Sequence, residues 1–336
     1  MQERKRIKPI PVKAFSGFSP KAGDISTLKR NHYFIEDRRS ISGEAPKHFI
    51  RVYEYGECKK ENTKTWPLYI AKLGHKWYPV ESITEYLLNR IGEVIGFNMA
   101  KSRLVWTGQQ IRFLSRYFLA NEKEQELVHG ADIYAGYLND KSFVKEIEEK
   151  RKEQEFFTVQ FTYEALFHLF PNEADALINE FVKLLVFDGF IGLMDRHIYN
   201  WGVIRNLKQK HNLVFSPIYD TARGLFWNES EEKILREARN LKTVDSFIKN
   251  YADKCTPKIG WEGKKNINHF QLIELLGKDA LGMKPKNILE LCSEHNIGII
   301  FSLLDTEFKN ILSTERIFLI KKCLEYRQKH ICEILK

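Results

Sequence analysis

The residues with the clearest chemical potential are two aspartates and an asparagine in the second half of the chain. Asp195 and Asn200 are the ends of the hexapeptide DRHIYN, and Asp220 follows twenty residues after Asn200. This spacing is typical of a phosphoryl-transfer site, in which one Asp orients the attacking hydroxyl while an Asn and a later Asp hold magnesium. We therefore predict that Asp195 is the catalytic base and that Asn200 and Asp220 are oxygen ligands of Mg²⁺.

A lysine in an apolar stretch is the second candidate. Lys72 lies in the predicted strand over residues 66–73, where an ammonium group is costly unless an anion pairs with it. We predict that it contacts the α- and β-phosphates of ATP and pairs with Glu85. Two alternatives stay open: Lys72 could point to water from an edge strand, and Glu85 could close a capping box with Ser82.

A turn-rich loop with the sequence SISGEAPK, residues 40–47, precedes these residues. It holds only one glycine, which is little for a phosphate-binding loop. Backbone N–H groups near Gly43, together with Ser42 and the ammonium group of Lys47, are nevertheless suited to hold phosphate. We therefore predict Ser42, Gly43, Lys47 and Lys72 as nucleotide-binding residues.

The elements that must position these residues follow a two-part pattern. Residues 1–38 are predicted to form an irregular basic arm. Residues 39–120 read as strand, strand, helix, strand, strand, and residues 121–336 as mostly helical. This order predicts an α+β, two-lobed protein-kinase-like fold. It has a small antiparallel N-terminal lobe that carries the phosphate loop and one helix, and a helical C-terminal lobe that carries the catalytic and metal-binding segments.

Apolar periodicity and turn signals place the individual elements. The small-lobe strands are predicted at 48–55, 66–73, 103–106 and 110–119, with the helix at 82–95. The large-lobe helices are predicted at 141–155, 160–169, 172–194, 229–251, 269–277, 284–295, 299–311 and 314–335. Short strands at 201–205 and 213–215 are expected to frame the catalytic segment.

Composition limits the class of protein. The chain has 336 residues, which suits two lobes, and its five cysteines are scattered without a CxxC pair, so a reducing compartment is expected. No signal peptide and no membrane-spanning run stand out, and we expect a cytoplasmic protein. The net charge of +9 permits both solvated surface lysines and attraction to polyanions.

These segments together resemble the HipA-like kinases. The loop at 40–47 is similar to that family's S-x-S-G-x-Q-P-K loop, and DRHIYN with the later Pro217-Ile218-Tyr219-Asp220 resembles its catalytic and metal segments. The chain begins almost directly at the loop, as the short HipT-type toxins do. DRHIYNWG also looks like the secreted, cell-translocating kinase of this superfamily, which leaves secretion as an alternative to the cytoplasm.

The resemblance implies an activity and partners. It implies ATP- and Mg²⁺-dependent phosphorylation of Ser or Thr on a protein, often an aminoacyl-tRNA synthetase, by the toxin of a toxin–antitoxin pair. It implies autophosphorylation of Ser40 and Ser42, and an antitoxin or a separately encoded N-terminal subdomain as partner. No helix-turn-helix stands out, so we expect no direct DNA binding. The chain departs from the family pattern at Ala45, where Gln is usual, and at Leu193, where Asn is frequent.

Two other functions stay open. A phosphoinositide-type lipid kinase also uses an Asp-Arg-His-x-x-Asn segment, although the loop at 40–47 favours the protein kinase. A catalytically silent corepressor or antitoxin-binding protein is the alternative outside enzymes. The joint presence of Lys72, Asp195, Asn200 and Asp220 argues against it, because a silent protein has no need of all four.

Overall fold

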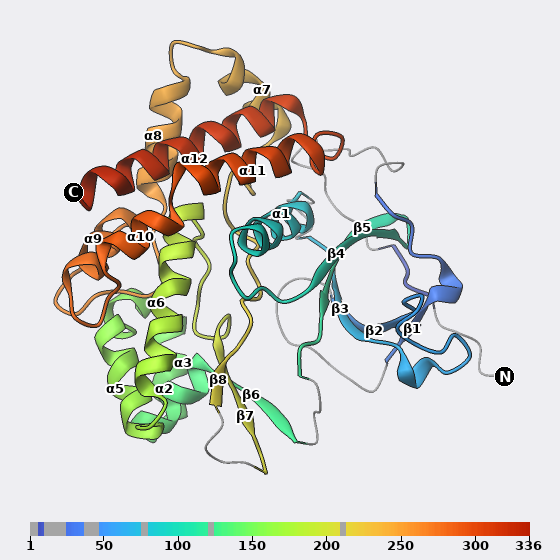
Figure 1. The fold of residues 1–336 in the computed structure, drawn as a ribbon, viewed down its shortest axis with the longest axis horizontal. Coiled ribbons are helices and arrows are strands. Elements are labelled where there is room, and N and C mark those ends of the chain that lie inside the picture. Colours follow the sequence, from blue (N-terminus) through green and yellow to red (C-terminus); the bar gives the residue numbers. More distant parts are fainter. Residues whose placement is uncertain (1–5, 10–24, 37–46, 75–79, 120–123, 209–212) are drawn as a thin grey trace.

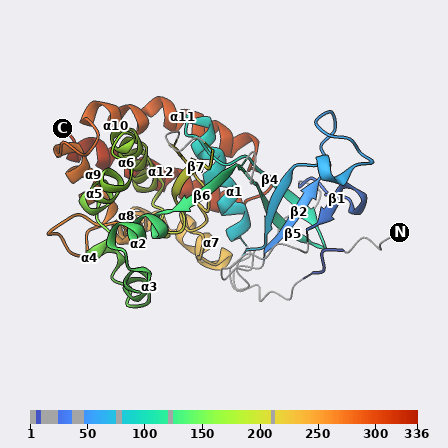
Figure 2. The ribbon, with the colours of Figure 1, turned by 90° about the horizontal axis from the view of Figure 1, so that it is seen from below.

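The computed structural model of the chain describes residues 6–9, 25–36, 47–74, 80–119, 124–208 and 213–336. The elements of the N-terminal third form a small lobe around an antiparallel sheet, and a larger, mostly helical lobe lies beside it (Figure 1). Figure 2 shows the same separation from a second direction, with the sheet towards one end of the molecule and most helices towards the other. The predicted two-lobed α+β arrangement is confirmed.

A five-stranded antiparallel sheet forms the body of the small lobe, in the order β1-β2-β3-β5-β4. Its strands are β1 (Tyr33–Ile35), β2 (Lys47–Val52), β3 (Leu68–Lys72), β4 (Ser102–Thr107) and β5 (Gln110–Arg116). Short 3-10 turns at Arg30–His32 and Thr63–Thr65 precede β1 and β3. Ile50, Ala71 and Leu114 are fully buried on one face of the sheet, where Ile7 and Tyr33 pack over them. The alternation of apolar residues therefore supplies this lobe with a core of its own.

Helix α1 (Glu81–Val94) packs against β4 and β5. Ile83, Leu87 and Ile91 recur at helical spacing, and all three are buried. Gly96 follows the helix with φ +88°, a left-handed conformation that glycine adopts without strain, so the helix ends as the sequence predicts. Val80 stands at the N-cap and makes no side-chain cap. The alternative capping box with Ser82 at its start is therefore absent, and Glu85 lies inside the helix.

The large lobe is built around one buried helix. Its helices are α2 (Gly130–Leu138), α3 (Lys141–Glu149), α4 (Glu153–Phe156), α5 (Val159–Leu169), α6 (Ala174–Ile191), α7 (Glu231–Arg239), α8 (Val244–Lys254), α9 (His269–Lys278), α10 (Pro285–Leu291), α11 (Glu294–Thr306) and α12 (Thr314–Ile334). Helix α6 contacts α5, α9 and α12, which explains why its sequence is apolar on nearly every side. No helix in the described residues is both long and apolar enough to cross a membrane.

A second, three-stranded antiparallel sheet lies where the chain leaves α6. It consists of β6 (Gln125–His129), β7 (Gly202–Asn206) and β8 (Leu213–Phe215), in that order. The loop that joins α6 to β7 carries Asp195 and Asn200, and the segment after β8 carries Asp220. The sheet therefore holds both ends of the predicted catalytic segment close together.

The structure also corrects several predicted elements. Residues 33–35, expected to be irregular, form β1 because they pair with β2. The single helix predicted over 229–251 is two helices, α7 and α8, because the Asn240 side chain accepts from the Lys242 N–H and turns the chain between them. The helix predicted over 141–155 is likewise divided into α3 and α4.

Two elements of the large lobe have no counterpart in the prediction. Strand β6 is held by pairing with β7, about 80 residues later in the chain. Helix α2 packs against α5. Neither element has a strong periodic pattern of apolar residues, because contacts with distant segments, rather than local secondary-structure propensity, stabilise both.

Candidate active site

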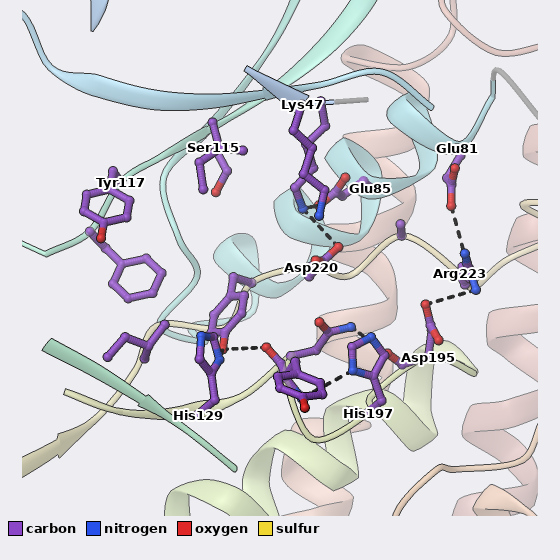
Figure 3. A pocket seen from close by; sticks show the side chains of 18 of the residues that line it. Lys47, Glu81, Glu85, Ser115, Tyr117, His129, Asp195, His197, Asp220 and Arg223 are labelled. Atoms are coloured by element: carbon purple, nitrogen blue, oxygen red, sulfur yellow. Dashed lines mark hydrogen bonds and ion pairs between the residues drawn. The ribbon is translucent and has the colours of Figure 1, made fainter. Parts of the chain in front are cut away.

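A cleft between the two lobes collects the predicted site residues that the structure describes. Its volume is about 930 Å³, large enough for a nucleotide. Lys47 and Glu85 line it from the small lobe, and Asp195 and Asp220 line it from the large lobe (Figure 3). Asn200 and Lys72 line the same cleft. Ser40, Ser42 and Gly43 lie outside the described residues, so their predicted roles stay predictions.

Lys72 is held by two carboxylates. Its Nζ lies 2.7 Å from Oε1 of Glu85 and 3.0 Å from Oδ1 of Asp220, and the residue is 7% exposed. Burial lowers the pKa of Lys72, but attraction to Asp220 and Glu85 outweighs it and raises the pKa above the ordinary 10.5. The ammonium group is therefore charged at neutral pH. The predicted pairing of Lys72 with Glu85 is confirmed, and the water-facing alternative is wrong.

Asp220 is an ionised carboxylate surrounded by positive charge. Burial raises the pKa of its carboxyl, but Lys72 and Lys47 oppose this and lower the pKa to about 2. Lys47 is near because the register of β2 and β3 places it directly opposite Lys72. Asp220 has φ +56°, a left-handed conformation that non-glycine residues adopt at some energetic cost. Such strain is found where the surrounding structure holds a functional side chain in one orientation.

The backbone before Asp195 is fixed by two hydrogen bonds. Nε2 of His269 donates to the carbonyl oxygen of Leu193 at 2.6 Å, and the Met194 N–H donates to the carbonyl oxygen of Arg223 at 3.0 Å. Burial lowers the pKa of His269 to about 3, so the imidazole is neutral and carries its proton on Nε2. His269 thus holds the position at which the chain has Leu193 instead of the family's frequent Asn.

Arg196 ties the catalytic loop to its surroundings. Its Nε and Nη2 donate to the carboxylate of Asp188 on α6 at 2.9 and 3.0 Å. Its Nη1 donates to the carbonyl oxygens of Asn200 and Tyr219, both at 2.8 Å. Arg196 is 2% exposed and Asp188 is 1% exposed. One guanidinium therefore joins the helix, the loop and the residue before Asp220, and so holds the loop in shape.

Asn200 is oriented by its own amide. Its Nδ2 donates to the backbone carbonyl oxygen of Asp195 at 2.8 Å, which leaves the side-chain oxygen as the atom that can bind a metal.

Gly202 lies two residues later, where an added Cβ would stand 2.4 Å from the carbonyl oxygen of Val128. Only glycine permits this close approach of β7 to β6.

The side chain of Asp195 faces a cation. Oδ2 of Asp195 lies 3.3 Å from Nη1 of Arg223, and Nε of Arg223 lies 3.5 Å from Oε1 of Glu81 (Figure 3). The same guanidinium lies 5.2 Å from the ring centre of Trp227. Burial raises the pKa of Asp195, with Arg223 opposing the rise. A raised carboxyl pKa suits a group that accepts a proton during a reaction.

The opposite end of the cleft is aromatic. The Tyr219 hydroxyl donates to the carbonyl oxygen of Tyr199 at 3.0 Å and lies 2.9 Å from Nδ1 of His129. The ring of Tyr219 lies 5.6 Å from that of Phe118, at the end of the segment that leaves β5. Flat apolar rings of this kind suit the planar base of a nucleotide.

The oxygen donors in the cleft fit magnesium. Mg²⁺ is commonly held by one or two protein carboxylate or amide oxygens together with substrate phosphates and water. Asn200 and Asp220 supply such donors, and the low pKa of Asp220 keeps its carboxylate ionised near neutral pH. The cation, when bound, neutralises phosphate charge.

Sequence reasoning missed several residues of the site. Arg223 contacts Asp195 and is itself contacted by Glu81, and His129 and Lys258 also line the cleft. Arg223 had a signal in the sequence, because it is the only charged residue between Asp220 and Glu229. The others had none, since nothing in the spacing of His129 or Lys258 links them to the DRHIYN segment.

Comparison with solved structures identifies the fold. The Helicobacter pylori proinflammatory kinase CtkA matches with a TM-score of 0.64 at 16% identity, over 85% of this chain and 92% of that one. HipA of Shewanella oneidensis MR-1, solved in a toxin–antitoxin complex with HipB and operator DNA, matches with a TM-score of 0.53 at 15% identity. That match covers 88% of this chain and 67% of the other. The fold is therefore a two-lobed kinase-like fold.

Sequence comparison assigns the family. No curated protein sequence matches the chain at a significant level. The family model of the HipA-like C-terminal domain matches residues 39–290, which include Lys72, Asp195, Asn200 and Asp220. The match also includes the loop at 40–47. Because it spans most of the chain, the protein belongs to the HipA-like C-terminal domain family.

Proposed function

We propose that the protein is an ATP- and Mg²⁺-dependent Ser/Thr protein kinase of HipA/HipT type. The observation that carries the proposal is the placement of Lys72 between Glu85 and Asp220, in the cleft that also contains Asp195 and Asn200. A lysine paired with a helix glutamate, a loop Asp–Asn pair and a later Asp are the parts that phosphoryl transfer from ATP requires.

Each residue has a distinct part in the proposed reaction. Lys72 binds the α- and β-phosphates, and Glu85 holds its ammonium group in place. Asp195 orients the acceptor hydroxyl and takes its proton as the oxygen–phosphorus bond forms. The bond between the γ-phosphorus and the β–γ bridging oxygen breaks, and ADP leaves. Asn200 and Asp220 hold the magnesium ion, which neutralises the charge on the phosphates.

The loop at 40–47 supplies nucleotide binding and regulation in this proposal. Ser42, Gly43 and Lys47 contact the nucleotide phosphates, and Ser40 and Ser42 are sites of autophosphorylation. Lys47 lies beside Lys72 and Asp220, so its ammonium group belongs to the phosphate-binding end of the cleft. A dianionic phosphate on a neighbouring serine would compete with ATP for this charge and lower the activity.

The proposed setting is a toxin–antitoxin pair. Family membership and the fold shared with HipA, which was solved together with HipB, support an antitoxin partner for this chain. The proposed substrate is a protein, with an aminoacyl-tRNA synthetase as the first to be tested. We place the kinase in the cytoplasm, with DNA contacted through a partner rather than by this chain.

Intact mass spectrometry tests the proposal. The purified chain is first dephosphorylated and then incubated with Mg·ATP, and peptide mapping locates any phosphate gained. An Asp195→Asn variant is treated in the same way. The expected result is a gain of phosphate on Ser40 or Ser42 in the wild type and no gain in the variant. Equal gains in both proteins would refute the role of Asp195.

A nucleotide-binding assay and a lipid-phosphorylation assay separate the alternatives. A wild type that binds Mg·ATP but phosphorylates neither itself nor any protein substrate is next tested on phosphoinositide vesicles, the substrate of the lipid-kinase alternative. A wild type that binds no nucleotide supports the silent binding protein. Asp195→Asn serves as the control in each assay because it removes the base and keeps the shape of the side chain.

A further inference from the structure

Arg223 is a cation of the cleft to which the proposed function assigns no role. The lysine and arginine side chains that line the described part of the cleft are Lys47, Lys72, Arg116, Arg223 and Lys258. Arg223 stands out from these because its guanidinium contacts the carboxylate of Asp195, at 3.3 Å. It therefore lies at the reacting end of the cleft, where the acceptor hydroxyl and the transferred phosphoryl group must meet.

Three of the other lysine and arginine side chains pair with other carboxylates. Lys72 is bonded to Glu85 and Asp220, and Nζ of Lys258 lies 3.2 Å from the buried carboxylate of Glu153. Nη1 of Arg116 lies 3.4 Å from Oε2 of Glu57, away from the catalytic loop. None of these three ion pairs involves Asp195.

The surroundings of Arg223 keep its guanidinium near Asp195 without burying it. Glu81 at the start of α1 contacts Nε, and the guanidinium lies over the ring of Trp227. The side chain is 30% exposed, so a ligand in the cleft can reach it. Figure 3 shows Arg223 between Glu81 above and Asp195 below, on the same side of the cleft as the catalytic loop.

We propose that Arg223 is a catalytic residue that contacts the γ-phosphoryl group of ATP during its transfer. The inference rests on the proposed kinase function. As the acceptor oxygen bonds to phosphorus and the bond to the leaving ADP oxygen breaks, negative charge spreads over the equatorial oxygens of the phosphoryl group. A planar guanidinium donates N–H bonds to two such oxygens at once. By turning to the phosphoryl group, Arg223 also leaves the Asp195 carboxylate to the acceptor hydroxyl and its proton.

A purely structural role makes different predictions. If Arg223 only links α1 to the catalytic loop, then its removal weakens the binding of ATP and ADP alike. Glu81→Gln, which breaks the other end of the same link, would then have a similar effect. A contact with the γ-phosphate instead weakens the binding of the triphosphate selectively, because ADP has no γ-phosphate.

Calorimetric titration separates the two roles. The probes are Mg·ADP and Mg·AMP-PNP, a non-hydrolysable ATP analogue, added to the full-length wild type, Arg223→Ala and Arg223→Lys. For Arg223→Ala we expect affinity for AMP-PNP to fall about tenfold to a hundredfold, the range of a hydrogen bond to a charged group, with affinity for ADP within about threefold. Arg223→Lys should recover part of the loss.

Two controls make the result specific. Arg116→Ala removes an arginine of the same cleft whose exposed fraction, 32%, is close to that of Arg223 at 30%, and it should not change the preference for AMP-PNP over ADP. Glu81→Gln should keep that preference. If Arg223→Ala does not fold, Arg223→Gln replaces it, since Gln keeps a planar donor without the charge.

The outcomes distinguish this inference from the proposed function. Suppose that the wild type binds both nucleotides and transfers phosphate. If Arg223→Ala then keeps the preference for AMP-PNP over ADP, or if Glu81→Gln changes it equally, the role of Arg223 alone is overturned. A wild type that binds neither nucleotide overturns the kinase proposal and this inference together. In steady-state assays of phosphate transfer, a supporting result is a fall in kcat larger than the rise in KM for ATP.

Discussion

Two arginines on opposite sides of the catalytic loop show how differently the molecule treats its interior and its cleft. Arg196 lies beneath the loop, 2% exposed, with its three guanidinium nitrogens bonded to Asp188 and to two backbone carbonyls. Arg223 lies on the cleft side, 30% exposed, at longer distances of 3.3 and 3.5 Å from its carboxylates.

The two sets of contacts have different consequences: those of Arg196 hold the fold, and those of Arg223 leave a side chain available for chemistry. Short, buried and fully satisfied hydrogen bonds fix the path of the loop, so removal of Arg196 must lower the free energy of unfolding. Long and partly exposed contacts contribute little stability but leave the guanidinium able to meet a ligand. Substitutions beneath the loop should therefore change the free energy of unfolding, and substitutions in the cleft should change activity.

The largest expected effect is on the cleft side. Asp195→Asn removes the proton acceptor, and phosphotransfer should fall about 10²–10⁴-fold. Its free energy of unfolding should stay within about 1 kcal/mol of wild type, because the contact with Arg223 is long and partly exposed. Turnover assays and urea unfolding of the same samples check both parts. Activity within a few fold of wild type would contradict the assignment of Asp195.

Beneath the loop, Arg196→Ala should mainly destabilise the fold. It leaves Asp188 buried without its cation, which costs about 3–5 kcal/mol. Burial already raises the pKa of Asp188, so the variant should also be less unstable at low pH, where this carboxyl takes a proton. Urea unfolding at two pH values measures this. Arg223→Ala is the matched control. Equal free energies of unfolding for the two variants would contradict the stabilising role of the buried arginine.

Lys72 belongs to both regions, because it is buried and also faces the cleft. Lys72→Met should also lower phosphotransfer, and it should lower the free energy of unfolding by about 2 kcal/mol, since two carboxylates lose their cation. Burial raises the pKa of Glu85 to about 7 in the wild type. Loss of the lysine raises it further, so the penalty should grow as pH rises through neutrality and Glu85 ionises.

The double variant Lys72→Met/Glu85→Gln tests that explanation. It should recover most of the stability lost by Lys72→Met, without recovering activity. Thermal unfolding between pH 5 and pH 8 is the measurement. A double variant as unstable as the single one would show that the cost arises from packing rather than from the unpaired carboxylate.

The smallest effect concerns acid stability. The pKa of Asp220 is about 2 in the folded chain and ordinarily 3.8, so the unfolded chain binds the proton more readily. The stabilisation, at most about 2 kcal/mol, is complete above pH 3.8 and is lost as pH falls towards 2. Asp220→Asn should therefore lose less stability than wild type over this interval, as followed by circular dichroism. Identical acid transitions would argue against the low pKa.

The predictions from sequence succeeded where local pattern and chemistry agree. Apolar spacing placed α1 and the start of α12 within a residue or two, and the cost of a lysine in an apolar strand pointed to the Lys72–Glu85 pair. They failed at β1, β6 and α2, which depend on pairing or packing with distant segments. Arg223 was missed because its partners come from α1 and from the loop before β7, so no spacing along the chain connects them.

The sequence by itself determined which chemical groups are present and which local elements carry them, because periodicity, apolar burial and ligand type are local properties. The tertiary structure decided how close those groups lie and how they ionise. Lys72 and Asp220 are 148 residues apart in the chain and 3.0 Å apart in space. That approach, together with the charge of Lys47, lowers the pKa of Asp220 to about 2, because charge interactions depend on distance and burial rather than on position in the sequence.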